Sequence, residues 1–197
     1  MVTKKYKLTE ETINVNGSIL HRIEAVRDFA NIKKGDKGGY VEKKENLSQC
    51  DDCWVFGNVV VFGNAVVCGN AKVYGDAKVC GDAKVYGKAR VLDNAKVYGK
   101  AVIYGNAKVC GNADVCGNAE IHGDAVITSK SDYIVFKNWW SSGRYFTWTK
   151  NNNMWKVGCF YGTGKELIEK AYKDSELSGR EYERIVGYVE TILQDTK

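Results

Sequence analysis

A six-residue repeat between residues 55 and 127 constrains the fold of this chain more than any other feature of its sequence. Val or Ile occupies every sixth position from Val55 to Ile127 without exception. Ala stands two residues before these positions in eleven of twelve units, and Gly stands two residues after them in eleven of twelve. Asn or Asp follows the Gly in ten of twelve units, and Lys88 and Lys100 are the exceptions. A repeat of Ala-x-Val-x-Gly-Asn units this regular predicts a solenoid.

The spacing within the unit indicates which side chains point inward. Ala and Val are two residues apart, so both lie on one side of an extended segment while the residue between them points away. Gly and Asn tolerate the left-handed backbone conformation of a tight corner. Three units then form one triangular coil, and successive coils stack as parallel sheets with Val, Ile and Ala in the interior.

The unit Ala71-Lys72-Val73-Tyr74-Gly75-Asp76 closely resembles the repeat of the bacterial transferase hexapeptide family. This resemblance implies a mainly β fold, a left-handed parallel β-helix, whereas the period alone leaves a right-handed solenoid open. The segments Gly38-Gly39-Tyr40-Val41-Glu42, Asn46-Leu47-Ser48 and Cys53-Trp54-Val55 are similar to the start of uncharacterised bacterial and phage hexapeptide proteins. Some of those proteins are called acetyltransferases on the repeat alone.

The segment before the repeat is expected to form a β-hairpin cap. It contains two short strands at 6–8 and 12–15, a hairpin signal at Asn16-Gly17 and a return strand at 19–25. Counting backwards in sixes places Cys53, Leu47 and Val41 at the Ala position of the unit, so the coil is expected to begin near Val41. The predicted divisions are an N-terminal β cap over residues 1–40, the left-handed β-helix over 41–130 and a C-terminal α+β domain over 131–197.

The segment after the repeat breaks the period and predicts a small β-β-β-α-α domain. The expected strands are 133–137, 145–150 and 154–157. Thr163 and Ser178 each begin a capping box, in which a hydroxyl and a carboxylate satisfy the first free amides of a helix. Gly158-Cys159-Phe160 with Gly162-Thr163 resembles a domain of unknown function that recurs in phage and bacterial proteins, and this likeness implies no particular chemistry.

Composition limits the classes of partner. The coil from 54 to 127 contains eight Lys and Arg against six Asp and Glu, and this net charge of 8 − 6 = +2 is too dilute for the footprint of a nucleic acid polymer. Lys4 and Lys5 are followed by polar residues, so we expect no secretory segment. The sequence has no run of about 20 apolar residues, so we expect a cytoplasmic protein without a membrane partner. Seven cysteines without an export signal predict free thiols. Cys50 and Cys53 lack a second pair, so we favour free thiols there over a zinc site.

Acyl transfer is the activity that the hexapeptide resemblance implies. Members with that activity use His as a general base, usually with a loop inserted into the coil, and bind acyl-CoA between subunits. Here His21 lies in the N-terminal hairpin, and His122 follows Ile121 in the last coil without a matching insertion. Because the register never slips from Val55 to Ile127, we favour a non-catalytic protein without a cofactor. A CoA-dependent acyltransferase remains an alternative, and His122 is interpreted as a surface residue that replaces Tyr.

Outward side chains fall into columns eighteen residues apart, and each column belongs to one face of the prism. Cations beside rings suit a small ligand that carries a phosphate and a ring, although Lys on exposed strands also keeps a sheet soluble. The predicted ligand-binding residues are Lys72, Tyr74, Arg90 and Lys108 on the first face, and Lys78, Lys96 and Tyr98 on the second. The third face is more apolar and predicts a subunit interface through Val66, Tyr86, Val102 and Tyr104.

These observations together predict a homotrimer that binds a small anionic, nucleotide-like ligand between its subunits. The trimer comes from the family resemblance and from the apolar third face. The likeness to phage-borne proteins makes a phage-encoded sequestering protein, acting against host signalling in the host cytoplasm, our working hypothesis. An oligomerisation scaffold that presents the C-terminal domain is the other alternative.

Overall fold

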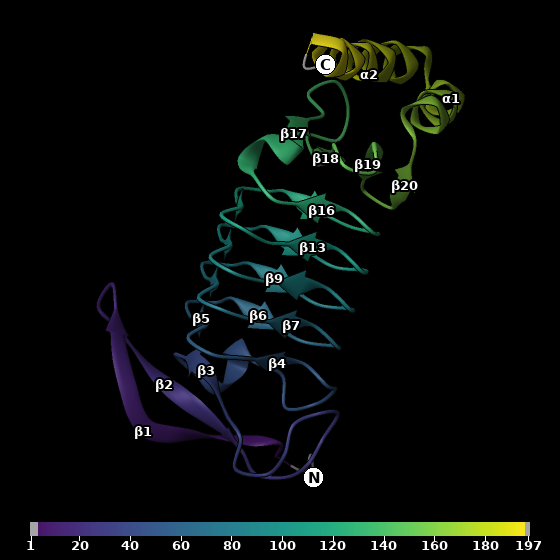
Figure 1. Ribbon diagram of the computed structural model, residues 1–197. Coiled ribbons are helices and arrows are strands. Elements are labelled where there is room, and N and C mark those ends of the chain that lie inside the picture. The colour runs from purple at the N-terminus through teal and green to yellow at the C-terminus, as the bar shows by residue number, and fades with distance from the viewer. Residues whose placement is uncertain (1–3, 196–197) are drawn as a thin grey trace.

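The six-residue units fold as a parallel β-solenoid in the computed structural model, which describes residues 4–195 (Figure 1). Each unit contributes a two-residue strand, in which an outward residue precedes the inward Val or Ile. The strands are β4 (Trp54–Val55), β5 (Val60–Val61), β6 (Val66–Val67), β7 (Lys72–Val73), β8 (Lys78–Val79), β9 (Lys84–Val85), β10 (Arg90–Val91), β11 (Lys96–Val97), β12 (Val102–Ile103), β13 (Lys108–Val109), β14 (Asp114–Val115), β15 (Glu120–Ile121) and β16 (Val126–Ile127). The predicted mainly β solenoid is confirmed, while its left-handed sense stays a prediction.

Three parallel sheets form the faces of the solenoid. The first face consists of β4, β7, β10, β13 and β16, the second of β5, β8, β11 and β14, and the third of β6, β9, β12 and β15. Paired residues are one coil of eighteen residues apart, as for Val73 and Val91. The N–H groups that flank the strands donate to carbonyls of the next coil, as from Tyr98 to Val115 at 3.0 Å. The outward residues therefore form the columns that the repeat predicts.

The inward side chains form one continuous core, and the corners explain the Gly of the unit. From Val55 to Ile127, the repeat's inward Val, Ile and Ala are 0% exposed. Gly81 has a φ of 67°, and a Cβ on it would lie 3.0 Å from the backbone nitrogen of Gly99 in the next coil. The corner thus needs Gly both for its backbone conformation and for the close stacking of coils.

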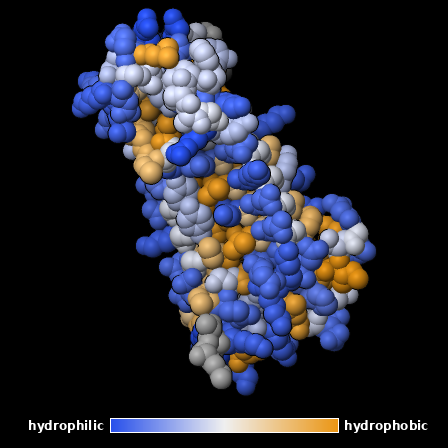
Figure 2. All heavy atoms as spheres, turned by 180° about the vertical axis from the view of Figure 1, so that it is seen from behind, coloured by the Kyte–Doolittle hydropathy of each residue, from blue (hydrophilic) through white to orange (hydrophobic). Residues whose placement is uncertain are grey.

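The N-terminal segment adds an antiparallel hairpin to the second face. β1 (Tyr6–Val15) pairs with β2 (Ser18–Ala25), and β3 (Lys37–Val41) pairs with β2 on one side and with β5 on the other. β1 is one strand where two were predicted, because a bulge between Leu8 and Thr12 interrupts the pairing without ending it. The tip of the hairpin extends away from the coils (Figure 1), and Figure 2 shows hydrophobic side chains gathered there.

The register of the first coil differs from the prediction. Val41 pairs with Val61, and Leu47 forms a bridge with Val67. These partners are twenty residues apart instead of eighteen, so Val41 and Leu47 occupy the Val position of the unit and not the Ala position. The two extra residues lie before Cys53, after the short 3-10 helix η1 (Lys44–Asn46), where the chain turns into the first regular coil.

The C-terminal segment forms a four-stranded antiparallel sheet followed by two helices. Its elements are η2 (Lys130–Asp132), β17 (Tyr133–Lys137), β18 (Tyr145–Thr149), β19 (Met154–Val157), β20 (Phe160–Gly162), α1 (Gly164–Asp174) and α2 (Glu176–Asp195). Trp148, Trp155 and Val186 belong to a core that is separate from that of the solenoid. The capping box at Thr163 is confirmed, but β20 was not predicted, and α2 begins two residues before Ser178, which lies inside it.

Side chains of the C-terminal sheet cover the last coil. Without a following coil, N–H groups at this end lack the carbonyls that they bind elsewhere in the solenoid. The Glu120 N–H donates to Thr147 Oγ1 at 2.9 Å, and the Val126 N–H donates to Asn151 Oδ1 at 3.0 Å. The Cys116 N–H donates to the hydroxyl of Tyr133 at 3.3 Å. The C-terminal sheet is therefore fixed to the end of the coil by hydrogen bonds that replace a further coil.

Candidate functional site

The first face carries three cations in direct succession. Lys72, Arg90 and Lys108, here called the cation column, are neighbours on β7, β10 and β13, and Arg90 and Lys108 are exposed. Lys72 donates to the carbonyl oxygen of Asp52, and its Nζ lies 5.9 Å from the ring centre of Phe56. Burial lowers the pKa of Lys72 from its ordinary value. The cations that the sequence placed together thus form a strip of positive charge.

A pair of rings flanks one end of the cation column. Tyr74 stacks on Phe56 with ring centres 4.4 Å apart and an angle of 9° between the rings. The same position in the next two coils holds Leu92, which is half-buried, and Cys110, which is buried. The stacking surface of the first face is therefore limited to its N-terminal half, beside Lys72.

The second face brings together the other predicted ligand-binding residues. Lys78 and Lys96 are neighbours on β8 and β11, and Lys96 is paired on its other side with Asp114. Lys78 Nζ lies 5.3 Å from the ring centre of Phe62. Tyr98 is exposed, and its hydrogen bonds with Cys116 and with Asp114 raise its pKa. The row of positive side chains on this face is shorter than the row on the first face, because Asp114 follows Lys96.

The third face carries the residues predicted for a subunit interface, and the chain itself covers part of them. Tyr86 stacks on Tyr104 at 5.0 Å, and Tyr104 contacts His122 at 4.1 Å between ring centres. Lys156 of the C-terminal sheet places its Nζ 5.9 Å from the ring centre of Tyr104. Val66 and Val102, the other two predicted interface residues, are half-buried. The N-terminal part of the third face therefore remains the more open part.

His122 lies between the rings of two tyrosines. Its ring is 4.1 Å from that of Tyr104 and 4.4 Å from that of Tyr161, and its Nδ1 is buried without a hydrogen-bond partner among residues 4–195. Burial and the ammonium of Lys156 lower the pKa of His122, while Asp124 acts in the opposite direction. The sequence did not predict this enclosure, because Tyr161 lies outside the repeat.

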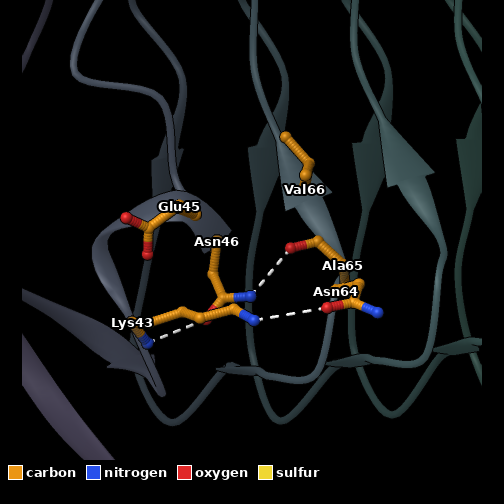
Figure 3. Close-up of a pocket in the computed structure, with 6 residues that line it drawn as sticks. All are labelled: Lys43, Glu45, Asn46, Asn64, Ala65 and Val66. Carbon is orange, nitrogen blue, oxygen red and sulfur yellow. Dashed lines mark hydrogen bonds between the residues drawn. The ribbon is translucent and has the colours of Figure 1, made fainter.

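A hollow of about 280 Å³ lies where the chain enters the third face (Figure 3). Its lining residues are Lys43, Glu45, Asn46, Asn64, Ala65 and Val66. The side-chain amide of Asn46 donates to the carbonyl of Ala65 at 2.8 Å, and Lys43 Nζ donates to Asn64 Oδ1 at 3.3 Å. These polar groups form hydrogen bonds with one another, so we interpret the hollow as part of the structural connection between the entering chain and the solenoid.

A second hollow, of about 330 Å³, lies between the third face and the C-terminal sheet, and we call it the junction cleft. Its lining residues are Lys100, Val102, Asn118 and Glu120 from the solenoid, with Arg144, Tyr145 and Gly158 from β18 and the connections of the C-terminal sheet. Of these, only Val102 was a predicted site residue. One sequence signal pointed here, because Lys100 departs from the Asn or Asp that ten of twelve units carry at this corner.

The described part of the chain shows neither a metal cluster nor a membrane helix. Within residues 4–195, no three His, Cys, Asp or Glu side chains are grouped so that they could hold a metal ion, and all seven cysteines are free. No helix in this range combines the length and the apolar character needed to cross a membrane.

The sequence matches no model of a known protein family, and no curated protein matches it significantly.

Proposed function

We propose that this chain is a non-catalytic binding protein for a small anionic, nucleotide-like ligand. The observation that carries the proposal is the cation column, whose three positive side chains stand side by side on the first face. Like charges directly opposite each other destabilise a sheet. A bound anion offsets this repulsion, so the column favours a ligand with negative charge.

The spacing of the column suits a phosphate, and the adjacent rings suit a base. Neighbouring strands lie about 4.8 Å apart, so one phosphate can contact cations from two successive coils. Arg90, in the middle, has a planar guanidinium that binds two oxygens at once. The half-buried Tyr74–Phe56 stack, next to Lys72, supports a ligand that also carries a ring.

We further propose that the chain is a homotrimer of the hexapeptide-repeat family, with the ligand between subunits. The first face of one copy is a sheet surface, and a small ligand is held by a concave site that buries most of its area. Packing the open part of the third face, at Val66 and Tyr86, beside the first face of a neighbouring copy supplies such a cleft. Light scattering should then give a mass near three times 21.9 kDa, and the mass of a single chain would contradict the trimer.

The likeness to phage-borne proteins extends the proposal to a biological role. In this role the protein is encoded by a phage and sequesters a signalling nucleotide in the host cytoplasm. A non-catalytic binder fits this role because it removes the ligand without altering it.

Isothermal titration calorimetry with a panel of linear and cyclic nucleotides tests the binding site. Arg90→Gln should weaken binding by about 1.5–3 kcal/mol, the range for a hydrogen bond to a charged group, and added salt should lower the affinity. Lys173→Gln is the matched control, because Lys173 is an exposed cation on α1, outside the solenoid faces. Equal affinities of wild type and Arg90→Gln would contradict the site.

A second measurement separates the binder from an acyltransferase. The bound nucleotide should be recovered chemically intact after denaturation of the wild-type complex, and His122→Ala should bind it normally. Turnover of acyl-CoA that disappears in His122→Ala would overturn the non-catalytic proposal. Trimer formation without nucleotide binding would instead favour the scaffold.

A further inference from the structure

We propose that the junction cleft is a second anion-binding site, which takes a small phosphorylated molecule with a flat or apolar body. The cleft lies between two independently packed parts of the chain, since the solenoid and the C-terminal sheet have separate cores. It is concave, at about 330 Å³, which lies at the lower end of the range for small-molecule sites. It lies on the third face and is distinct from the cation column.

Two cations without partners converge on the cleft. Lys100 comes from a corner of the solenoid, and Arg144 comes from the loop before β18. Neither side chain forms a hydrogen bond or an ion pair with any residue in the range 4–195. Cations from two directions, one of them a guanidinium, match the geometry of a phosphate group. Unpaired charges that share a concave site therefore indicate an anionic ligand.

The remaining charges of the cleft are already engaged. Lys156 donates to the carbonyl of Gly158, and its Nζ lies 4.0 Å from a carboxylate oxygen of Glu120. This pairing offsets the negative charge of Glu120 and leaves Lys100 and Arg144 as the unpaired cations. Gly158 contributes no side chain, and a Cβ on it would lie 4.0 Å from Arg144 Nη1, so the guanidinium lies next to this open position.

The cleft also offers a surface for the body of the ligand. Tyr145 is 43% exposed, and its ring is available for stacking. A neighbouring hollow of about 200 Å³ shares Arg144, Tyr145 and Gly158 with the cleft and is lined further by Phe146, Val157 and Tyr182. Asn138 and Ser142 also line this hollow, so a ligand whose phosphate lies between Lys100 and Arg144 can extend along Tyr145 into a recess that has both apolar and polar walls.

Calorimetry on the full chain with adenosine 5′-monophosphate, adenosine and inorganic phosphate tests this site. Wild type should bind the monophosphate at least about tenfold more tightly than adenosine, because each charged contact contributes about a factor of ten or more. Lys100→Asn and Arg144→Gln should each lose about tenfold or more. Lys100→Asn restores the residue that the repeat favours at its corner, and Arg144 is exposed, so neither change disturbs the core.

The matched control is Lys88→Asn, the same substitution at the other corner where Lys replaces Asn or Asp. Lys88→Asn should bind the monophosphate as wild type does, and Arg90→Gln reports separately on the cation column. If Arg90→Gln lowers the affinity for the monophosphate while Lys100→Asn and Arg144→Gln do not, this site is overturned and the binding belongs to the cation column. Equal affinity for adenosine and its monophosphate, or no binding of the monophosphate and of phosphate at about 10 mM, would also overturn it.

Discussion

Neighbouring residues of the repeat have opposite environments, and this contrast gives a direct test of the register. Ala83 is 0% exposed, whereas Lys84 on β9 is exposed. Ala83→Leu should overpack the core and cost about 1–3 kcal/mol of unfolding free energy. Lys84→Gln should change it by less than about 0.5 kcal/mol. Urea unfolding of the two variants measures both values, and equal losses would contradict the proposed register.

His122 should make the fold sensitive to mild acid. Its pKa is lowered in the folded chain by burial and by Lys156, so folding disfavours the protonated imidazole. Above a pH of about 6.5 the imidazole is neutral in both states and has no effect. As the pH falls through that value, the unfolded chain takes up the proton more readily, and stability is lost.

His122→Tyr should remove this part of the acid sensitivity. Tyr is the residue that Tyr86 and Tyr104 supply in the same column, so it continues the ring stack without a group that titrates in this range. Urea unfolding at pH 7.5 and at pH 5.5 measures the effect, and the variant should lose less stability between the two. An equal loss in both proteins would show that His122 is not the responsible group.

Whether a contact between single residues could be predicted depended on whether both residues lie inside the repeat. The cation column followed from the six-residue period, because the period alone decides which residues point outward and which stack. The contact of His122 with Tyr161 and the junction cleft could not be predicted. Tyr161 and Arg144 reach the solenoid from outside the repeat, and a period contains no information about such contacts.

Elements with a strong local signal were predicted, and those set by tertiary contacts were not. The first-coil register shifted by two residues because Asp51 turns with a φ of 58° and Lys5 Nζ binds the carbonyls of the turn. The helix α2 starts before the predicted cap at Ser178, because Ser175, which also ends α1, accepts the N–H of Ser178. A capping box at Ser178 is a valid local pattern, but the tight connection between the helices excludes it.

The contact between β18 and the last coil should contribute measurably to stability. Thr147 is fully buried, and its Oγ1 accepts the Glu120 N–H at 2.9 Å. Thr147→Val preserves the shape of the side chain but leaves that N–H without an acceptor, which should cost about 1–3 kcal/mol. Thr12→Val, on the exposed side of β1, should be nearly neutral. If denaturant unfolding finds the two variants equally stable, this hydrogen bond is not what fixes the sheet to the coil.

The molecule as a whole is a solenoid with complementary groups at its two ends. The last coil presents N–H groups, and oxygen atoms of Tyr133, Thr147 and Asn151 accept from them. The first coil presents carbonyls, and nitrogen atoms of Lys5 and Asn46 donate to them. Unpaired strand edges at the ends of a repeat protein favour growth into filaments. The flanking segments therefore have a structural role that is independent of any ligand.

A substitution at Lys5 tests whether the N-terminal segment satisfies the unpaired groups of the first coil. Its side chain is 0% exposed, and its Nζ donates to the carbonyls of Cys50, Asp51 and Cys53 at 3.1, 3.1 and 2.8 Å. Lys5→Met keeps the length of the side chain but leaves these carbonyls without a donor. We expect a loss of at least about 2 kcal/mol, because each buried unsatisfied group costs about 1–3 kcal/mol.

Lys7→Met is the control, because the Lys7 side chain is 55% exposed and forms a surface ion pair with Glu24 at 2.9 Å. Surface ion pairs contribute about 0–1 kcal/mol, so this variant should unfold at nearly the wild-type denaturant concentration. Light scattering on the folded variants adds a second readout, since carbonyls released at the end of the coil should increase self-association of Lys5→Met alone. Equal stability and equal mass of the two variants would show that the first coil does not need the Lys5 side chain to satisfy its carbonyls.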